Sequence, residues 1–158
     1  NLALNKVVYF AHVWFLVGFG RPLIDQKFAA WQHGPLVQDV YHSFKTFGDK
    51  AISGRAKRLD RATAQCVLCE QAFSEKELAL LLPVINYYSP IPASKLRNMT
   101  HVVGGPWDRI WNHEGPSNPG MLIPDSDIVD FYAERLPAIG AVNAYSQSPQ
   151  PSSLRQVR

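Results

Sequence analysis

The stretch LALNKVVYFAHVWFLV occupies residues 2–17 of the 158-residue chain. Its apolar side chains recur at helical spacing. Six of them define one face of a helix: Leu4, Val7, Val8, Ala11, Trp14 and Phe15. Asn5, Lys6 and His12 interrupt the stretch, so it does not form the run of about 18 apolar residues that is typical of a transmembrane helix. The stretch therefore predicts a core helix that ends at Gly18 and Gly20, and no membrane association is expected.

Glycine and proline divide the rest of the chain into short elements. Further helices are predicted where a cap or a proline precedes helical spacing, beginning near Pro35, Ser74, Ser94, Pro106 and Asp125. Ser74 with Glu77 three residues later is typical of a capping box. A small β-element is expected near residues 23–31, and a second candidate lies within residues 51–69. The fold class predicted is mainly α, a compact helical domain with a small β-element.

The length of the chain allows one domain with one substantial core. We expect this domain to span residues 1–140. Residues 141–158 are rich in Pro, Ser, Gln and Ala, and we expect them to form a flexible C-terminal tail because they offer little apolar area to bury. The first residue is Asn1 and not Met, so we expect the natural protein to continue upstream.

The charge distribution argues against a nucleic-acid partner. Up to Gly140 the chain carries 14 Lys and Arg against 13 Asp and Glu, because two of the 16 basic residues, Arg155 and Arg158, lie in the tail. Strong nucleic-acid binders usually show a basic stripe. One basic cluster exists, diluted by Asp49 and Asp60, and we expect it to be a solvated loop: Lys50, Arg55, Lys57, Arg58 and Arg61.

No catalytic set is visible in the sequence. A zinc site would need a second ligand pair beside Cys66 and Cys69, and none occurs, so we expect core cysteines in a reducing cytoplasm. The histidines form no ligand pair on one helix face, and both the serine nucleophile elbow and the phosphate-binding loop are absent. The chain is therefore predicted to be no enzyme and to need no cofactor or metal.

Two segments instead couple a tryptophan to a rigid Gly/Pro turn, namely residues 28–37 and 104–111. Tryptophan is common both in cores and at the centres of protein interfaces, so a core role and a partner-binding role are about equally expected. The candidates for a binding region or its support are Trp31, His33, Gly34, Pro35, Gln38 and Tyr41 in the first segment and after it, with Trp107, Asp108 and Trp111 in the second.

The same residues carry a resemblance. Residues 4–12 (LNKVVYFAH), 20–23 (GRPL) and 28–37 (FAAWQHGPLV) resemble the Panacea domain, also called the SocA-like antitoxin domain. The family pattern has leucines where Val7 and Val8 stand and a valine where Leu36 stands. Thr100-His101 followed by Gly105-Pro106-Trp107 resembles a second family signature, and the resemblance covers roughly residues 4 to 136.

The resemblance implies a cytoplasmic antitoxin, bacterial or carried by a prophage, that neutralises a cognate toxin protein by direct protein-protein binding. Two alternatives stay open. One is a DNA-binding autoregulator of its own operon, which the nearly neutral body disfavours. The other is a proteolytic adaptor that delivers its partner to a protease. The resemblance names neither the toxin nor the oligomeric state.

Overall fold

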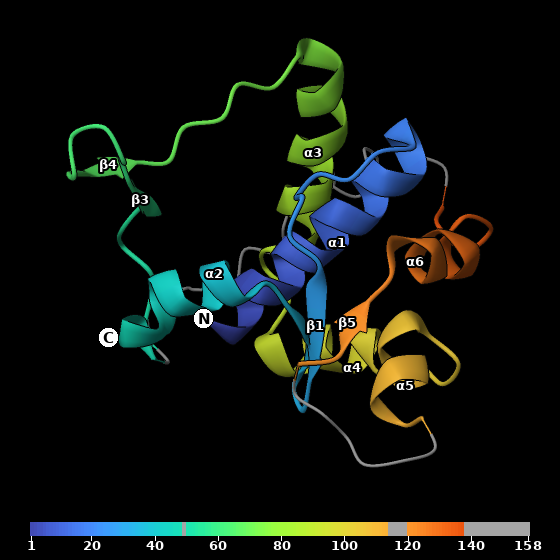
Figure 1. The fold of residues 1–158 in the computed structure, drawn as a ribbon. Helices are drawn as coiled ribbons and strands as arrows, with labels where there is room; N and C mark the ends of the chain where they lie inside the picture. The colour runs from blue at the N-terminus through green and yellow to red at the C-terminus, as the bar shows by residue number, and fades with distance from the viewer. Residues whose placement is uncertain (49, 114–119, 138–158) are drawn as a thin grey trace, which may run out of the picture.

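The computed structural model describes residues 1–48, 50–113 and 120–137. In chain order the elements are α1 (Leu2–Phe19), β1 (Phe28–Trp31), β2 (Gly34–Leu36), α2 (Gln38–Phe44), the 3-10 helix η1 (Lys45–Phe47), β3 (Lys57–Leu59), β4 (Cys66–Leu68), α3 (Glu75–Tyr88), α4 (Ala93–Thr100), α5 (Pro106–Trp111), β5 (Leu122–Ile123) and α6 (Asp125–Tyr132). The domain is mainly α with a small β-element, which confirms the predicted fold class (Figure 1). The predicted tail, residues 141–158, lies outside the described residues.

Helix α1 is the centre of the domain. It packs against α3, α4, α6 and β2, which leaves little of its surface in solvent (Figure 1). The sequence predicts one apolar face, but the helix is buried on most sides, and Tyr9, Val13 and Phe15 are at most 1% exposed. Within the described residues α1 is the one helix that is long and apolar enough to cross a membrane, and 56% of it is buried inside the protein. The burial of α1 in the core therefore accounts for its apolar composition.

A three-stranded antiparallel sheet lies against α1 in the order β2-β1-β5. The central strand β1 pairs Ala29 with Leu36 of β2 and Phe28 with Ile123 of β5. Phe28, Ala29 and Ala30 have no exposed surface. The side chain of Phe28 packs edge-on against Tyr9 of α1, with ring centroids 5.2 Å apart, so the sheet and the helix share one core.

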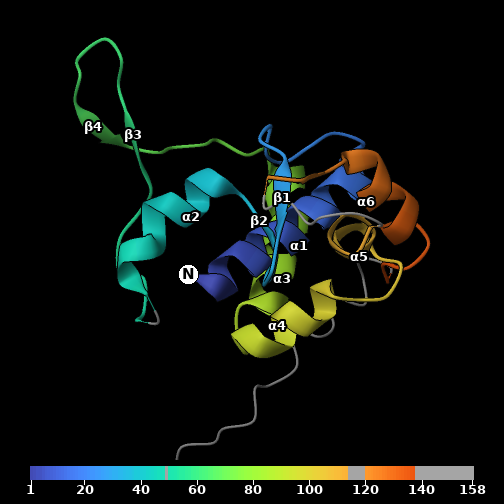
Figure 2. The same ribbon diagram turned by 60° about the horizontal axis from the view of Figure 1, so that its bottom comes forward.

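The second sheet is a hairpin of β3 and β4, and both views show it standing apart from the body (Figures 1 and 2). Lys57, Arg58 and Arg61 of the predicted basic cluster belong to this hairpin, whereas Lys50 and Arg55 lie in the segment that precedes it. The prediction of core cysteines is wrong, because Cys66 and Cys69 are both exposed. The apolar flanks that favoured burial belong to a hairpin whose strands are largely exposed.

The helix boundaries follow the predicted caps with one exception. The capping box of Ser74 and Glu77 is present at the start of α3, α5 begins at Pro106, and α1 ends at Gly20 in the left-handed conformation. Pro35, however, does not open a helix: it lies in β2, and α2 begins at Gln38. Proline is tolerated in an edge strand, and here the pairing of β2 with β1 outweighs the local preference.

Gly34 is the residue on which the β1–β2 turn depends. Its φ is +96°, and a Cβ atom there would lie 2.6 Å from Thr100 Oγ1 and 2.9 Å from Lys6 Nζ. Gly20 has a φ of +66° but no atom within 4 Å of a Cβ. A side chain at Gly20 would therefore introduce backbone strain alone, whereas a side chain at Gly34 would add a steric clash to the same strain.

We expect Gly20→Ala to lower the free energy of unfolding by about 1–2 kcal/mol, the cost of a left-handed alanine. Gly34→Ala should cost clearly more, because it adds a collision with buried atoms to the same strain. Urea denaturation of both variants measures the difference. Equal losses in the two proteins would show that the space around Gly34 does not constrain the turn.

Candidate functional site

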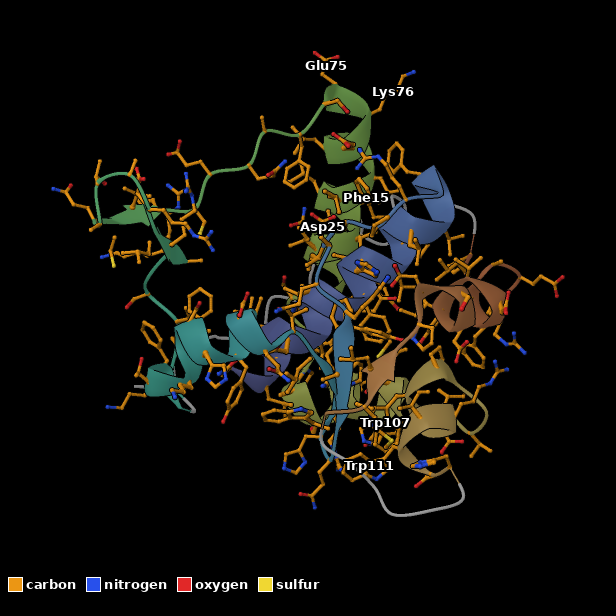
Figure 3. The ribbon with its side chains drawn as sticks, viewed as in Figure 1. Phe15, Asp25, Glu75, Lys76, Trp107 and Trp111 are labelled. Carbon is orange, nitrogen blue, oxygen red and sulfur yellow. The ribbon has the colours of Figure 1, made fainter. Side chains whose placement is uncertain are left out.

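The fold brings the two predicted tryptophan segments together at one end of β1. The indole Nε1 of Trp107 donates a hydrogen bond to the carbonyl oxygen of Trp31 at 2.8 Å, across 76 residues of sequence. Trp107 stacks on Trp111 with ring centroids 5.7 Å apart, and Trp31 contacts the ring of Tyr41 at 5.2 Å. Figure 3 shows Trp107 and Trp111 close together beside the lower end of β1.

Four of the nine candidate residues have internal roles. Gly34, Pro35 and Trp107 are buried. Asp108 accepts a hydrogen bond from the backbone N–H of Gly104 at 2.8 Å and another from the side chain of Asn112 at 2.6 Å, so its carboxylate stabilises the turn before α5 and the helix itself. These residues support a surface and do not form it.

The other five candidates reach the solvent. His33 and Gln38 are exposed, and Trp31, Tyr41 and Trp111 are half-buried. We call these five residues the turn surface. The indole N–H of Trp31 is buried and has no hydrogen-bond partner within the part of the chain that the structure describes. The turn surface thus combines polar side chains at a hairpin tip with three aromatic rings.

Two polar side chains of α1 hold the strand beneath this surface. Lys6 is 1% exposed, and its Nζ donates a hydrogen bond to the carbonyl oxygen of Pro35 at 2.7 Å. The side-chain oxygen of Asn5 accepts a hydrogen bond from the backbone N–H of Val37 at 3.3 Å. The sequence analysis assigned these two residues no role. The available signal was a lysine within an otherwise apolar helix, since lysine is rarely buried without a partner.

The surroundings of Lys6 disfavour the positively charged form of its side chain. Burial and, to a smaller extent, the nearby guanidinium of Arg97 together lower its pKa from 10.5 to about 7. None of the ion pairs among the described residues includes Lys6. Near neutral pH the folded protein therefore holds an amine that is ready to lose its proton.

This shift predicts a pH dependence of stability. Between pH values of about 7 and 10, an unfolded chain keeps the proton on Lys6 and the folded protein has lost it, so the free energy of unfolding should rise with pH. We expect a rise from pH of about 7 to about 9 by urea denaturation, and a flatter profile for Lys6→Met. The exposed Lys95→Met is the control and should keep the wild-type profile. An unchanged slope in Lys6→Met would contradict the assignment.

A second feature is a groove that the sequence did not predict. It has a volume of about 1140 Å³ and lies between α1 and α3 on one side and the two segments that lead to the β3–β4 hairpin on the other. Its apolar lining includes Leu4, Val7, Val8, Leu23, Ile24, Ile52, Phe73, Leu81 and Ile85. This volume exceeds the roughly 300–1,000 Å³ of ordinary small-molecule sites. The residues of the groove come from four distant parts of the sequence, which is why no local pattern indicated it.

The described residues contain no group of three or more His, Cys, Asp or Glu side chains that could hold a metal ion. His12, the most buried histidine, packs against Phe28 with ring centroids 5.0 Å apart, and burial lowers its pKa. His101 is partly buried against Trp107 at 3.7 Å between centroids. These histidines contribute to packing beneath the turn surface and around α1.

The division of the tryptophans into support and surface can be tested. Trp107→Ala should lower the free energy of unfolding by about 3–5 kcal/mol, because it removes a buried ring and the hydrogen bond to Trp31. Trp111→Ala should cost less than half of that, since its ring is half-buried. Guanidinium denaturation gives both values. If the Trp107→Ala protein were as stable as the Trp111→Ala protein, Trp107 would belong to the surface and not to its support.

Comparisons with known proteins give the family of this chain. The family described as Antitoxin SocA-like, Panacea domain, matches residues 4–108, which include α1 from Leu4 onward, the β1–β2 turn and the first half of α5. The protein called Antitoxin SocA from Caulobacter vibrioides (strain NA1000 / CB15N) is 37% identical to this chain over 133 residues, 84% of this chain and 71% of that protein. No solved structure matches the fold. The matched region contains Lys6 and Asn5 of α1 and every residue of the turn surface except Trp111, and the chain belongs to the family of SocA-like antitoxins with a Panacea domain.

Proposed function

We propose that this chain neutralises a cognate toxin by direct protein contact. The observation that carries the proposal is the 37% identity to Antitoxin SocA across 84% of this chain. An antitoxin of this kind acts by occupying a surface of its partner, so it needs complementary side chains and no catalytic group. We further propose that it acts in the cytoplasm, where the exposed free thiols of Cys66 and Cys69 would remain reduced.

The turn surface is our proposed contact region. Trp31, Tyr41 and Trp111 are of the residue types that dominate protein interfaces energetically. His33 lies at the tip of a two-residue turn whose backbone is held by Gly34 and by the hydrogen bond from Lys6 to Pro35. A side chain on a backbone that is already ordered loses less entropy on binding. His33 and Gln38 are therefore the polar side chains that we expect to contact the toxin.

The test uses the protein encoded next to this chain. If that protein is a toxin, co-expression should restore growth, and the two proteins should co-purify. Restored growth without a physical complex would point to indirect action, such as repression of an operon, and would overturn the proposal.

The contact region is tested by His33→Ala. We expect an unchanged melting temperature, because the side chain is exposed, and a loss of toxin affinity of about tenfold, measured by calorimetric titration. Lys76→Ala is the control: its exposed side chain lies at the opposite end of the molecule from Trp107 and Trp111 (Figure 3), so the affinity should not change. If a normally folded His33→Ala protein bound the toxin with wild-type affinity, the turn would not be part of the interface.

A further inference from the structure

The β3–β4 hairpin and the segments that join it to the body, residues 50–73, form a projection that we call the arm. Every residue of β3 and β4 is exposed except the half-buried Val67. The two strands pair only with each other. An isolated two-stranded hairpin is marginally stable in water, so the arm lacks the packing that a hairpin ordinarily needs.

One face of the hairpin carries Leu59, Cys66 and Leu68, with Lys57 beside Leu68 on the same face. In antiparallel pairing Leu59 lies opposite Cys66, and Leu68 lies two residues further along the same face. Leu59 is 60% exposed and Leu68 is 42% exposed. These side chains are large for a solvated surface and are available for contact with a partner.

The arm is also the basic part of the molecule. Residues 50–73 carry five basic side chains, Lys50, Arg55, Lys57, Arg58 and Arg61, against two acidic ones, Asp60 and Glu70. The three described ion pairs of the domain include none of these seven side chains. The basic side chains of the arm are all exposed to solvent, and one of them, Lys50, lines the apolar groove.

Helix α3 supplies an apolar wall on the other side of the groove. Leu78, Leu82 and Ile85 recur at helical spacing and are 38%, 53% and 37% exposed. They form a second apolar stripe on α3, beside the one that faces the core through Leu81 and Val84. Ile85 lines the groove, so the stripe meets the groove at this residue.

We propose that the groove and the arm together bind an amphipathic, acidic helix of the toxin. This inference rests on the proposed function and extends it to a second contact region. The apolar face of such a helix would lie against Val7, Val8 and Ile85, and its acidic side chains would face the basic residues of the arm. A helix in an apolar groove is a recurrent mode of recognition. Nucleic acid is the weaker candidate, because phosphates gain nothing from the apolar wall of the groove or from Leu59 and Leu68.

The experiment uses a fluorescein-labelled synthetic helix of about 18 residues, built from Leu, Ala and Glu with leucine on one face. Fluorescence anisotropy should show saturable binding to the wild-type domain. A second peptide with Lys in place of every Glu should bind at least about tenfold more weakly, because the arm would repel it. Absence of binding by the acidic peptide, or equal binding by both peptides, would overturn the inference.

Two pairs of variants locate the binding. Ile85→Glu should weaken binding of the acidic peptide at least about tenfold, since it places a charge in the apolar groove. Val103→Glu, the same kind of change at a site that is 89% exposed and outside the groove lining, should not. Reversal of Lys57 and Arg58 to Glu should weaken binding, whereas reversal of the exposed Lys95 and Arg109 should not. Equal effects within either pair would overturn the inference. The inference would also be wrong if a labelled duplex DNA bound the arm and displaced the peptide more effectively than salt does.

The toxin itself separates this inference from the proposed function. If the wild-type chain co-purifies with the toxin and Ile85→Glu binds it with unchanged affinity, the second contact region is wrong and the proposed function stands. If the wild-type chain forms no complex with the toxin, the proposed function is wrong, and the helix of that toxin is no longer an occupant of the groove.

Discussion

The hydrogen bond from the buried Lys6 ammonium to the carbonyl oxygen of Pro35 is the interaction on which the rest of the domain depends. It joins the central helix α1 to β2, which lies at one edge of the three-stranded sheet. Asn5 makes the neighbouring bond to Val37, so two consecutive side chains of α1 hold β2 and the residue that follows it. Burial of an ammonium without a carboxylate is costly, and the gain is a fixed position for the β1–β2 turn.

This arrangement also explains which residues the turn accepts. Gly34 is adjacent to Lys6 and Thr100 with no space for a Cβ, and Pro35 needs no donor on its nitrogen and presents its carbonyl oxygen to Lys6. Trp107 closes the other side by donating to Trp31. The turn that carries His33 is therefore held by contacts with α1 and α5, although the exposed side chain of His33 itself contributes little to stability.

Much of the fold could be predicted because its signals are local. The helical spacing of residues 2–17, the capping box of Ser74 and the proline that opens α5 each depend on atoms within one or two turns of helix. Pro35 was misplaced because its local preference for a helix start competes with strand pairing, which involves residues at some distance. The cysteines were misplaced for the same reason, since burial depends on what packs against a segment. The nine candidate site residues could be selected by type, and the structure brings the two tryptophan segments together. Their division into support and surface depends on contacts of Lys6 and Trp107 with distant parts of the sequence, which no local pattern contains.

The central position of α1 has a consequence for how the protein is made. Residues 2–19 are synthesised before the elements that cover this helix, which extend to α6, ending at Tyr132. Until the ribosome has released almost the whole domain, an apolar helix with a lysine near its start lacks its neighbours and is open to chaperones and proteases. Because domains of this size generally fold as units, an interrupted or truncated translation product would contain the helix and lack its covering, and would be removed without ever presenting the β1–β2 turn in its final form.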